Sequence, residues 1–266
     1  MAKPTGGWIW YELMTSDSDA ATRFYEAVVG WKVHAMPDPQ AGGIDYRHIA
    51  RSDGGSAGGM LALNKDMTDH GARPCWVGYI HVADVDAEVA KITADGGKVL
   101  MPAMDLPVGR MAMVTDPQGA PFYVMKPVPP AGQPDAESDV FSPDQPEHVR
   151  WNELMSSDAD GAVAFYTGHY GWTQEGDMDM GAMGKYRFIQ HDGLSIGAIM
   201  PKMPQMPMSA WNHYIGVDNI DRAVAAVNAG GGQVINGPME IPGGEFALNG
   251  IDPQGAMFGL VGPRKG

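Results

Sequence analysis

The stretch Trp10-Tyr-Glu-Leu-Met-Thr-Ser-Asp17 decides the fold, because it occurs a second time as Trp151-Asn-Glu-Leu-Met-Ser-Ser-Asp158. The two copies differ at only two positions. Each is typical of a β-strand, in which side chains alternate between the two faces, so Trp10 and Glu12 share one face. Such a repeated landmark indicates a chain built by internal duplication.

Further landmarks recur in the same order. Each copy is followed by a helical pattern that contains Phe-Tyr and is closed by Gly-Trp. Later in each half come a Trp and a Tyr three residues apart, and then an Asp-Pro-Gln-Gly-Ala turn. Because several landmarks keep their order at similar spacing, the second half of the chain repeats the first.

The elements within each half form two modules of one strand, one helix and three strands. In the first module, Asp17 or Asp19 can cap a helix whose apolar residues Ala21, Phe24, Tyr25 and Val28 form one stripe. The predicted strands there are 8–14, 31–35, 45–50 and 56–63, and in the second module 76–82, 98–103, 110–115 and 121–125. The sequence therefore predicts an α+β fold of four such modules. The expected domains are 1–127 and 148–266, and the linker 128–147 is rich in Pro and acidic residues.

Composition excludes several classes of function. The net charge of −14 argues against binding of nucleic acid or of anionic membrane surfaces, which need a basic face. Cys75 is the single cysteine, which excludes an internal disulfide and a cysteine-based zinc cluster. No stretch approaches the roughly 20 apolar residues of a membrane span. We expect a cytoplasmic monomer or homodimer whose partner is a small molecule.

The modules, the Phe-Tyr helix closed by Gly-Trp and the Asp-Pro-Gln-Gly turn together resemble the vicinal oxygen chelate superfamily. This group contains glyoxalases, bleomycin-resistance proteins and extradiol dioxygenases. The resemblance covers nearly the whole chain except the linker, and the halves opening on Trp-x-Glu-Leu look most like a two-domain glyoxalase-like subgroup. It implies curved mixed sheets from paired modules that enclose cups, in which a small molecule binds, often with a divalent metal.

The positions of the family's usual metal ligands hold other residue types here. The first-strand positions are Trp10, Val77, Trp151 and Asn212. The positions four residues after the closing turn's glycine are Tyr123 and Gly259. Metals in proteins need converging oxygen, nitrogen or sulfur donors. A divalent metal is compatible with the family, but the usual quartet is absent, and we expect no metal site of the family type and no cofactor.

Glu12, Tyr79, Glu153 and Tyr214 occupy equivalent positions, five residues before the helix start of each module. The resemblance implies that they face the cups. A partly desolvated Glu can act as a general base, and a Tyr can donate to a developing oxyanion. The residues also permit a purely structural role, in which a buried Glu and Tyr satisfy each other. The catalytic candidates are therefore Glu12, Glu153, Tyr79 and Tyr214, and the ligand-binding candidates are Trp10, Trp151, His81 and Tyr123.

Three functions remain open at this point. The first is a glyoxalase-like enzyme of the lyase class that acts on or binds a small carbonyl-type or aromatic molecule. The second is a non-catalytic protein that binds or sequesters a drug-like molecule. The third is a metal-dependent lyase or dioxygenase with an atypical site. Fold cannot separate them, because one superfamily hosts many functions.

Overall fold

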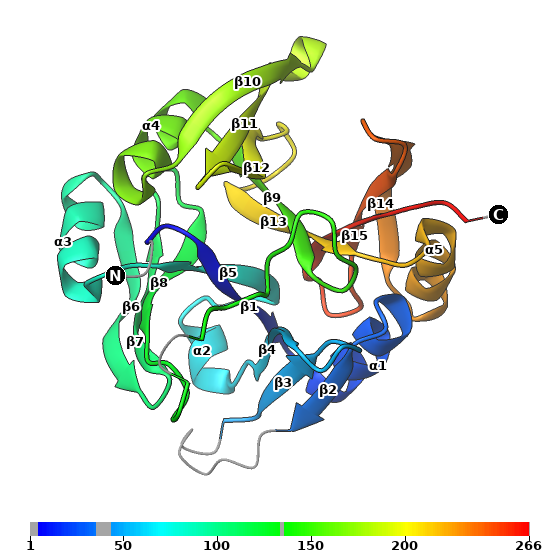
Figure 1. Ribbon diagram of the computed structural model, residues 1–266, viewed down its shortest axis with the longest axis horizontal. Helices are drawn as coiled ribbons and strands as arrows, with labels where there is room; N and C mark the ends of the chain where they lie inside the picture. The colour runs from blue at the N-terminus through cyan, green and yellow to red at the C-terminus, as the bar shows by residue number, and fades with distance from the viewer. Residues whose placement is uncertain (1–4, 36–43, 134–135, 266) are drawn as a thin grey trace. The chain divides into compact units, whose positions relative to one another are not determined.

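The computed structural model describes residues 5–35, 44–133 and 136–265, and the four predicted modules are present (Figure 1). The first half comprises β1 (Trp8–Thr15), α1 (Ser18–Val28), β2 (Lys32–Ala35), β3 (Tyr46–Ala50), β4 (Ser56–Ala62), α2 (Lys65–Asp69), β5 (Cys75–His81), α3 (Val85–Ala94), β6 (Lys98–Leu106), β7 (Gly109–Thr115) and β8 (Pro121–Pro127). The second half comprises β9 (Val149–Ser156), α4 (Ala159–Tyr170), β10 (Thr173–Asp179), the 3₁₀ turn η2 (Gly181–Met183), β11 (Lys185–His191), β12 (Leu194–Pro201), β13 (Ala210–Gly216), α5 (Ile220–Ala229), β14 (Gln233–Glu240), β15 (Phe246–Ile251) and β16 (Met257–Gly262).

Among the described residues, the short helix α2 and the 3₁₀ turn η2 were not predicted. The cap of α2 is Asn64, whose side chain accepts a hydrogen bond from the Met67 amide at 2.9 Å. Residues 36–43, between the predicted strands 31–35 and 45–50, lie outside the described residues, as do residues 134–135 of the predicted linker.

The strands form two eight-stranded mixed sheets, which confirms the α+β prediction. Their strand orders are β2-β3-β4-β1-β5-β8-β7-β6 and β10-β11-β12-β9-β13-β16-β15-β14. Within each module the last strand returns parallel to the first, so that Glu12 in β1 lies opposite Gly59 in β4. In the second half Glu153 in β9 lies opposite Ala198 in β12.

Helix α1 forms as its sequence predicts. The Asp17 side chain accepts from the Ala20 amide at 2.9 Å and so caps the helix. Its predicted apolar stripe, which includes Phe24 and Tyr25, is buried. The helix is followed by Gly30 with φ of 102°, a left-handed conformation that favours glycine.

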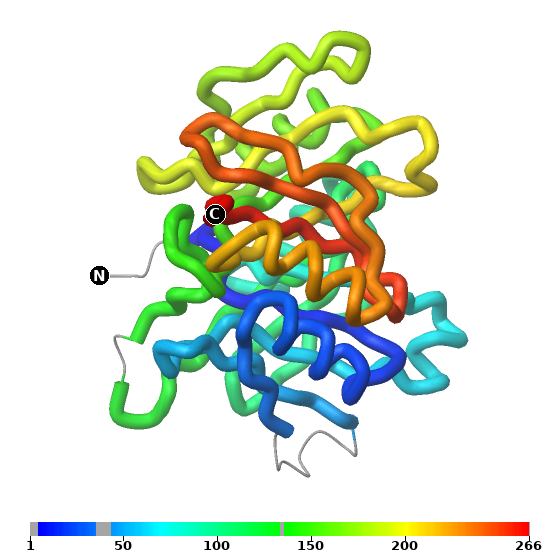
Figure 2. The backbone as a smooth tube through the Cα atoms, turned by 90° about the vertical axis from the view of Figure 1, so that its right-hand side faces the viewer, coloured from blue at the N-terminus to red at the C-terminus, as the bar shows by residue number. Residues whose placement is uncertain are grey.

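The Cα positions group into two compact units, and each unit takes residues from both halves. The first contains the described residues of 1–9, 78–138 and 151–211, and the second contains 10–77, 139–150 and 212–266. In the second unit α1 lies beside α5 (Figure 2), and Arg222 donates to the carbonyls of Ala27 at 2.9 Å and Val28 at 3.0 Å. In the first unit Lys91 of α3 donates to the Gly168 carbonyl of α4 at 2.9 Å. A cation from one half thus satisfies the last carbonyls of a helix in the other half. The predicted domain boundaries follow the sequence repeat, and they stay a prediction.

The second unit is crossed by a buried hydrogen-bond chain that joins three landmarks of the repeat. The Tyr25 hydroxyl accepts from Trp76 Nε1 at 2.9 Å and lies 3.1 Å from Asp252 Oδ2, to which it donates. Tyr25 belongs to the Phe-Tyr helix of the first half, and Asp252 opens the Asp-Pro-Gln-Gly turn of the second half. The repeated landmarks therefore bind the two halves to each other.

The first unit contains the reciprocal chain. Here the Tyr166 hydroxyl accepts from Trp211 Nε1 at 2.9 Å and donates to Asp116 Oδ2 at 3.3 Å. Burial raises the pKa of Asp116 to about 6, although the Ala120 amide also donates to this carboxylate at 2.8 Å. The Tyr166 phenol is thus one of the few donors that stabilise the Asp116 carboxylate, whose burial costs free energy.

The two Gly-Trp landmarks make a second reciprocal exchange. Trp31 Nε1 donates to the Glu147 carbonyl at 2.8 Å, just before the first strand of the second half. Trp172 Nε1 donates to the Gly6 carbonyl at 2.7 Å, just before the first strand of the first half. Both indoles are buried. The tryptophans that close α1 and α4 therefore hold the entry segment of the opposite half.

Among the described residues, no helix combines the length and the apolar composition needed to cross a bilayer.

Tyr166→Phe should lower the free energy of unfolding by about 1–3 kcal/mol at neutral pH, because it leaves the Trp211 donor and the Asp116 carboxylate without their shared partner. Tyr25→Phe should behave alike. Tyr170→Phe is the matched control, since this buried hydroxyl at the end of α4 makes no hydrogen bond of ordinary geometry. Urea unfolding measures all three. Equal losses for Tyr166→Phe and Tyr170→Phe would contradict the role given to the chain.

Candidate functional site

The first half places a buried carboxylate at the end of a second kind of hydrogen-bond chain. Glu12 in β1 is 3% exposed. Trp10 Nε1 donates to the Tyr46 hydroxyl at 3.0 Å, and that hydroxyl is hydrogen-bonded to Glu12. Trp10 and Tyr46 are half-buried. Burial, followed by the charge of Glu12, holds the pKa of the Tyr46 phenol well above its usual range.

The second half repeats the arrangement on β9 and β11. Trp151 Nε1 donates to the Tyr186 hydroxyl at 2.7 Å, and this hydroxyl donates to Glu153 Oε2 at 2.9 Å. Glu153 is 7% exposed, while Trp151 and Tyr186 are half-buried. The two chains lie in different compact units, and each is complete within its own unit.

These contacts decide what the phenol and the carboxylate can do. The one proton of the Tyr186 hydroxyl is directed at Glu153, and its oxygen already accepts from an indole. Tyr186 therefore positions the carboxylate and has no proton to spare for a ligand. A hydrogen bond to the charged form of a carboxylate favours that form. Glu12 and Glu153 each accept a hydrogen bond from a phenol and lie beside a half-buried tryptophan ring.

The surroundings of the two carboxylates differ. The His48 ring lies 6.1 Å from Trp10 in a stacked arrangement, and His48 Nε2 is 2.9 Å from Ser56 Oγ. In the second half Phe188 meets Trp151 edge to face at 6.3 Å. The first site thus has a polar ring and a hydroxyl where the second has an apolar ring.

Gly59 is a further difference between the halves. A Cβ at this position would lie 2.0 Å from the Tyr46 hydroxyl oxygen, so only glycine leaves room for this phenol. The residue opposite Glu153 is Ala198, which already carries a methyl group. The two sites are therefore related by duplication but are not chemically equivalent.

Cys75 lies near the first carboxylate, and its thiol remains protonated. Burial, with a contribution from the charge of Glu12, raises the pKa of Cys75 to about 12. The thiolate is the nucleophilic form of cysteine. Nucleophilic chemistry at Cys75 is therefore disfavoured near neutral pH.

The two candidate tyrosines have different neighbours. Tyr79 stacks on Tyr123 with ring centroids 4.1 Å apart. Tyr214 lies opposite Gly259, where a Cβ would come within 2.5 Å of its ring. Glu12 belongs to the second compact unit and Tyr79 to the first, and the same division separates Tyr214 from Glu153. The proposed Glu–Tyr partnerships stay a prediction.

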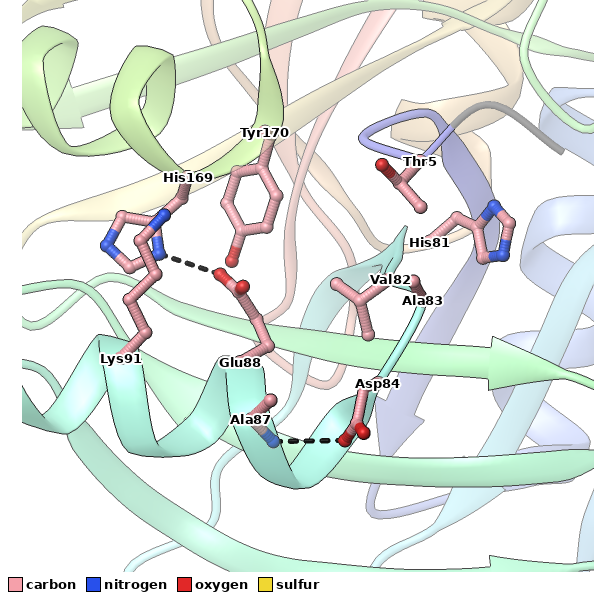
Figure 3. A pocket seen from close by; sticks show the side chains of 10 residues that line it. All are labelled: Thr5, His81, Val82, Ala83, Asp84, Ala87, Glu88, Lys91, His169 and Tyr170. Carbon is pink, nitrogen blue, oxygen red and sulfur yellow. Dashed lines mark hydrogen bonds and ion pairs between the residues drawn. The ribbon is translucent and has the colours of Figure 1, made fainter. Parts of the chain in front are cut away.

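The two first-strand histidines have separate environments. His81, a ligand-binding candidate, lines a small pocket at one end of β5 (Figure 3). His213 is fully buried with its ring 4.9 Å from that of Tyr11, and burial lowers its pKa to about 3. The equivalent arginines Arg47 and Arg187 form ion pairs with Asp19 and Asp160.

The residues at the family's usual metal-ligand positions do not fit a metal. Trp10 and Trp151 present indoles whose N–H groups are donors engaged by tyrosines. Tyr123 stacks on Tyr79, and Gly259 has no side chain. Within the described part of the chain, no three His, Cys, Asp or Glu side chains cluster as a metal site would require.

Sequence reasoning missed Tyr46 and Tyr186 as the partners of the two glutamates. The signal was present, since Tyr-Arg recurs at 46–47 and 186–187. The tyrosine of each pair is the residue that reaches Glu12 or Glu153. Sequence reasoning missed this contact because the two strands that carry it, β1 and β3, are not adjacent: β4 lies between them in the sheet.

Comparison with known proteins agrees with this fold. The model of the Glyoxalase/Bleomycin resistance protein/Dioxygenase superfamily matches residues 8–124 and again 145–260. The chain therefore belongs to this superfamily and contains two glyoxalase domains.

Two curated relatives cover nearly the whole chain. The protein named "Putative glyoxylase CFP32" from Mycobacterium bovis is 35% identical over 257 residues, which are 96% of this chain and 94% of that protein. The protein named "Anthracycline biosynthesis protein DnrV" from Streptomyces peucetius is 30% identical over 278 residues, covering 97% of this chain and 93% of the relative.

Solved structures share the fold at lower identity. The Mn(II)-bound glyoxalase from Novosphingobium aromaticivorans has a TM-score of 0.63 at 17% identity, and the match covers 98% of this chain and 83% of that one. The 2,2',3-trihydroxybiphenyl 1,2-dioxygenase from Sphingomonas wittichii has a TM-score of 0.65 at 11% identity, over 97% of this chain and 90% of that one.

Cys75 provides a test of the electrostatics around Glu12. With a pKa of about 12, the folded protein should react with iodoacetamide at pH 8 about a hundredfold or more slowly than the urea-unfolded protein. Glu12→Gln should speed the reaction of the folded protein, because it removes a negative charge that disfavours the thiolate. Mass spectrometry of Cys75 measures both rates. Equal rates for folded and unfolded protein would contradict the raised pKa.

Proposed function

We propose that this protein is a glyoxalase-superfamily enzyme that acts on a small carbonyl-type or aromatic molecule, with Glu12 and Glu153 as proton acceptors. The proposal rests on a hydrogen-bond chain that occurs once in each half of the protein. In it an indole N–H donates to a phenol, and the phenol donates to a buried glutamate. A purely structural carboxylate does not require an accessible aromatic ring beside it. Trp10 and Trp151 are half-exposed, which suits contact with a ligand.

The chemistry proposed is proton transfer at a polarised substrate. A buried glutamate can, in its charged form, remove a proton from a carbon next to a carbonyl or from a hydroxyl group. Tyr46 and Tyr186 act as positioning residues, because their protons are committed to the glutamates. Tyr79 and Tyr214 are proposed as donors to the oxygen on which negative charge develops. No step is assigned to a metal, since the side chains at the usual ligand positions do not suit one.

The substrate class follows from the rings around each glutamate. Aromatic faces bind flat apolar molecules by stacking, and a carboxylate nearby selects a hydroxyl or another acidic group. Two relatives carry names that refer to a glyoxylase and to anthracycline biosynthesis. An anthracycline is a polycyclic aromatic compound, so this name supports an aromatic ligand. His48 in the first site and Phe188 in the second favour different ligands, or different ends of one ligand type.

A binding protein without chemistry is the second candidate. It is favoured by the stacked Trp10–His48 pair and by the Trp151–Phe188 pair, because such rings hold a planar drug-like molecule without any proton transfer. In that case Glu12 and Glu153 would only accept hydrogen bonds from the ligand.

The double variant Glu12→Gln with Glu153→Gln should lose turnover by about a hundredfold or more, because Gln keeps the shape but cannot accept a proton. Methylglyoxal and an anthracycline such as doxorubicin are suitable probes, followed by consumption and by chromophore fluorescence. The single variants report which half works. Glu240→Gln, an exposed carboxylate on β14, is the control.

Unchanged turnover in the double variant would remove both glutamates from the mechanism. Tight binding of a probe that the wild-type protein returns unaltered after long incubation would favour the binding protein. Thermal unfolding of each variant separates loss of function from loss of fold.

A further inference from the structure

A small pocket lies in the first compact unit, apart from the glutamate chains. It is formed where β5 ends, where α3 begins and where α4 ends, and its volume is about 280 Å³ (Figure 3). Val82 and Ala87 supply part of its apolar wall, and Asp84, Glu88 and Tyr170 supply polar groups. His81 also lines it, but neither Glu12 nor Glu153 does.

The wall on the side of α4 is a cluster of polar groups around the buried His169. The His169 side chain is 2% exposed, and its Nδ1 lies 2.7 Å from Glu88 Oε1. Its Nε2 lies 3.0 Å from Asp95 Oδ2. Both ring nitrogens are therefore engaged, and His169 has no polar atom left for a ligand. It fixes the Glu88 carboxylate at the edge of the pocket, beside the Tyr170 hydroxyl.

The Tyr170 side chain points toward this wall of the pocket. Its side chain is 4% exposed, and its hydroxyl lies beside Glu88 at the edge of the pocket (Figure 3). This hydroxyl makes no hydrogen bond of ordinary geometry to any described residue. A buried phenol in that position has an unmet capacity for hydrogen bonding, which a bound ligand would satisfy.

The charge around the pocket favours a cation. A helix N-terminus such as that of α3 usually attracts anions. Here the Asp84 side chain already accepts from the Ala87 amide at 3.0 Å, and the first turn also carries Asp86 and Glu88. The one lysine in the lining, Lys91, donates to the Gly168 carbonyl at 2.9 Å. The groups that face the pocket are thus mainly acceptors.

We propose that this pocket binds a small organic amine, whose ammonium group donates to Glu88, to the Tyr170 oxygen and to Asp84. The carbon skeleton of the amine would contact Val82 and Ala87. An ammonium group has three donors, which matches the three oxygens. This site goes beyond the proposed function, because its residues are not those of the glutamate chains and it recognises an ammonium group.

The test uses three probes of one shape, namely benzylamine, benzyl alcohol and benzoate, with titration calorimetry and NMR on the full chain. Benzylamine should bind and shift the signals of Tyr170, whereas the neutral and the anionic probe should not bind in the same concentration range. Glu88→Gln should weaken benzylamine by about tenfold or more, because the charge-assisted hydrogen bond is lost. Asp86→Asn, on the same helix but outside the pocket lining, should change it by about twofold at most.

The variant Ala87→Leu tests whether the pocket itself is the binding site, because it leaves every polar group in place. It fills the pocket, and benzylamine binding should be abolished while the thermal midpoint stays near that of the wild type. Absence of benzylamine binding, equal binding of benzoate, or benzylamine binding that survives Ala87→Leu would each overturn the proposal. Loss of binding in Glu88→Gln counts in its favour only where circular dichroism shows an intact fold.

Discussion

A tyrosine hydroxyl that accepts from an indole and donates to a carboxylate is the interaction on which this molecule depends. Among the described residues it is centred on Tyr25, Tyr166, Tyr46 and Tyr186. A carboxylate inside a protein is costly unless hydrogen bonds compensate it, and a phenol that is itself polarised by an indole is a strong donor. The duplicated protein uses this interaction both in its scaffold and in its candidate sites.

The scaffold and the site are distinguished by what surrounds the carboxylate. Asp116 and Asp252 open tight turns, receive backbone amides and connect a helix of one half to a turn of the other. Burial raises the pKa of both. Glu12 and Glu153 instead end chains whose tryptophans are half-exposed. The aspartate chains explain why the halves are bound together, and the glutamate chains provide the chemistry that we propose.

The sequence predicted what depends on local pattern. Alternation and helical stripes located the four modules, and the repeat identified Glu12 and Glu153 as equivalent positions. It could not reveal that Tyr25 reaches Asp252, because residues so far apart in sequence leave no local signal of contact. Strand parity suggested that each glutamate and a tyrosine of a paired module act together, and this stays a prediction. It did not indicate Tyr46, which strand order brings near Glu12. The loss of the usual metal ligands was readable directly, because it depends only on residue types.

The most direct test of the central claim is a crystal structure of the protein with the ligand that the binding and turnover assays identify. We expect an oxygen or acidic carbon of the ligand within hydrogen-bond distance of the Glu12 or Glu153 carboxylate, beside Trp10 or Trp151. Tyr46 or Tyr186 should still be hydrogen-bonded to the glutamate. A ligand bound elsewhere, with both glutamates hydrogen-bonded only to protein, would contradict the central claim.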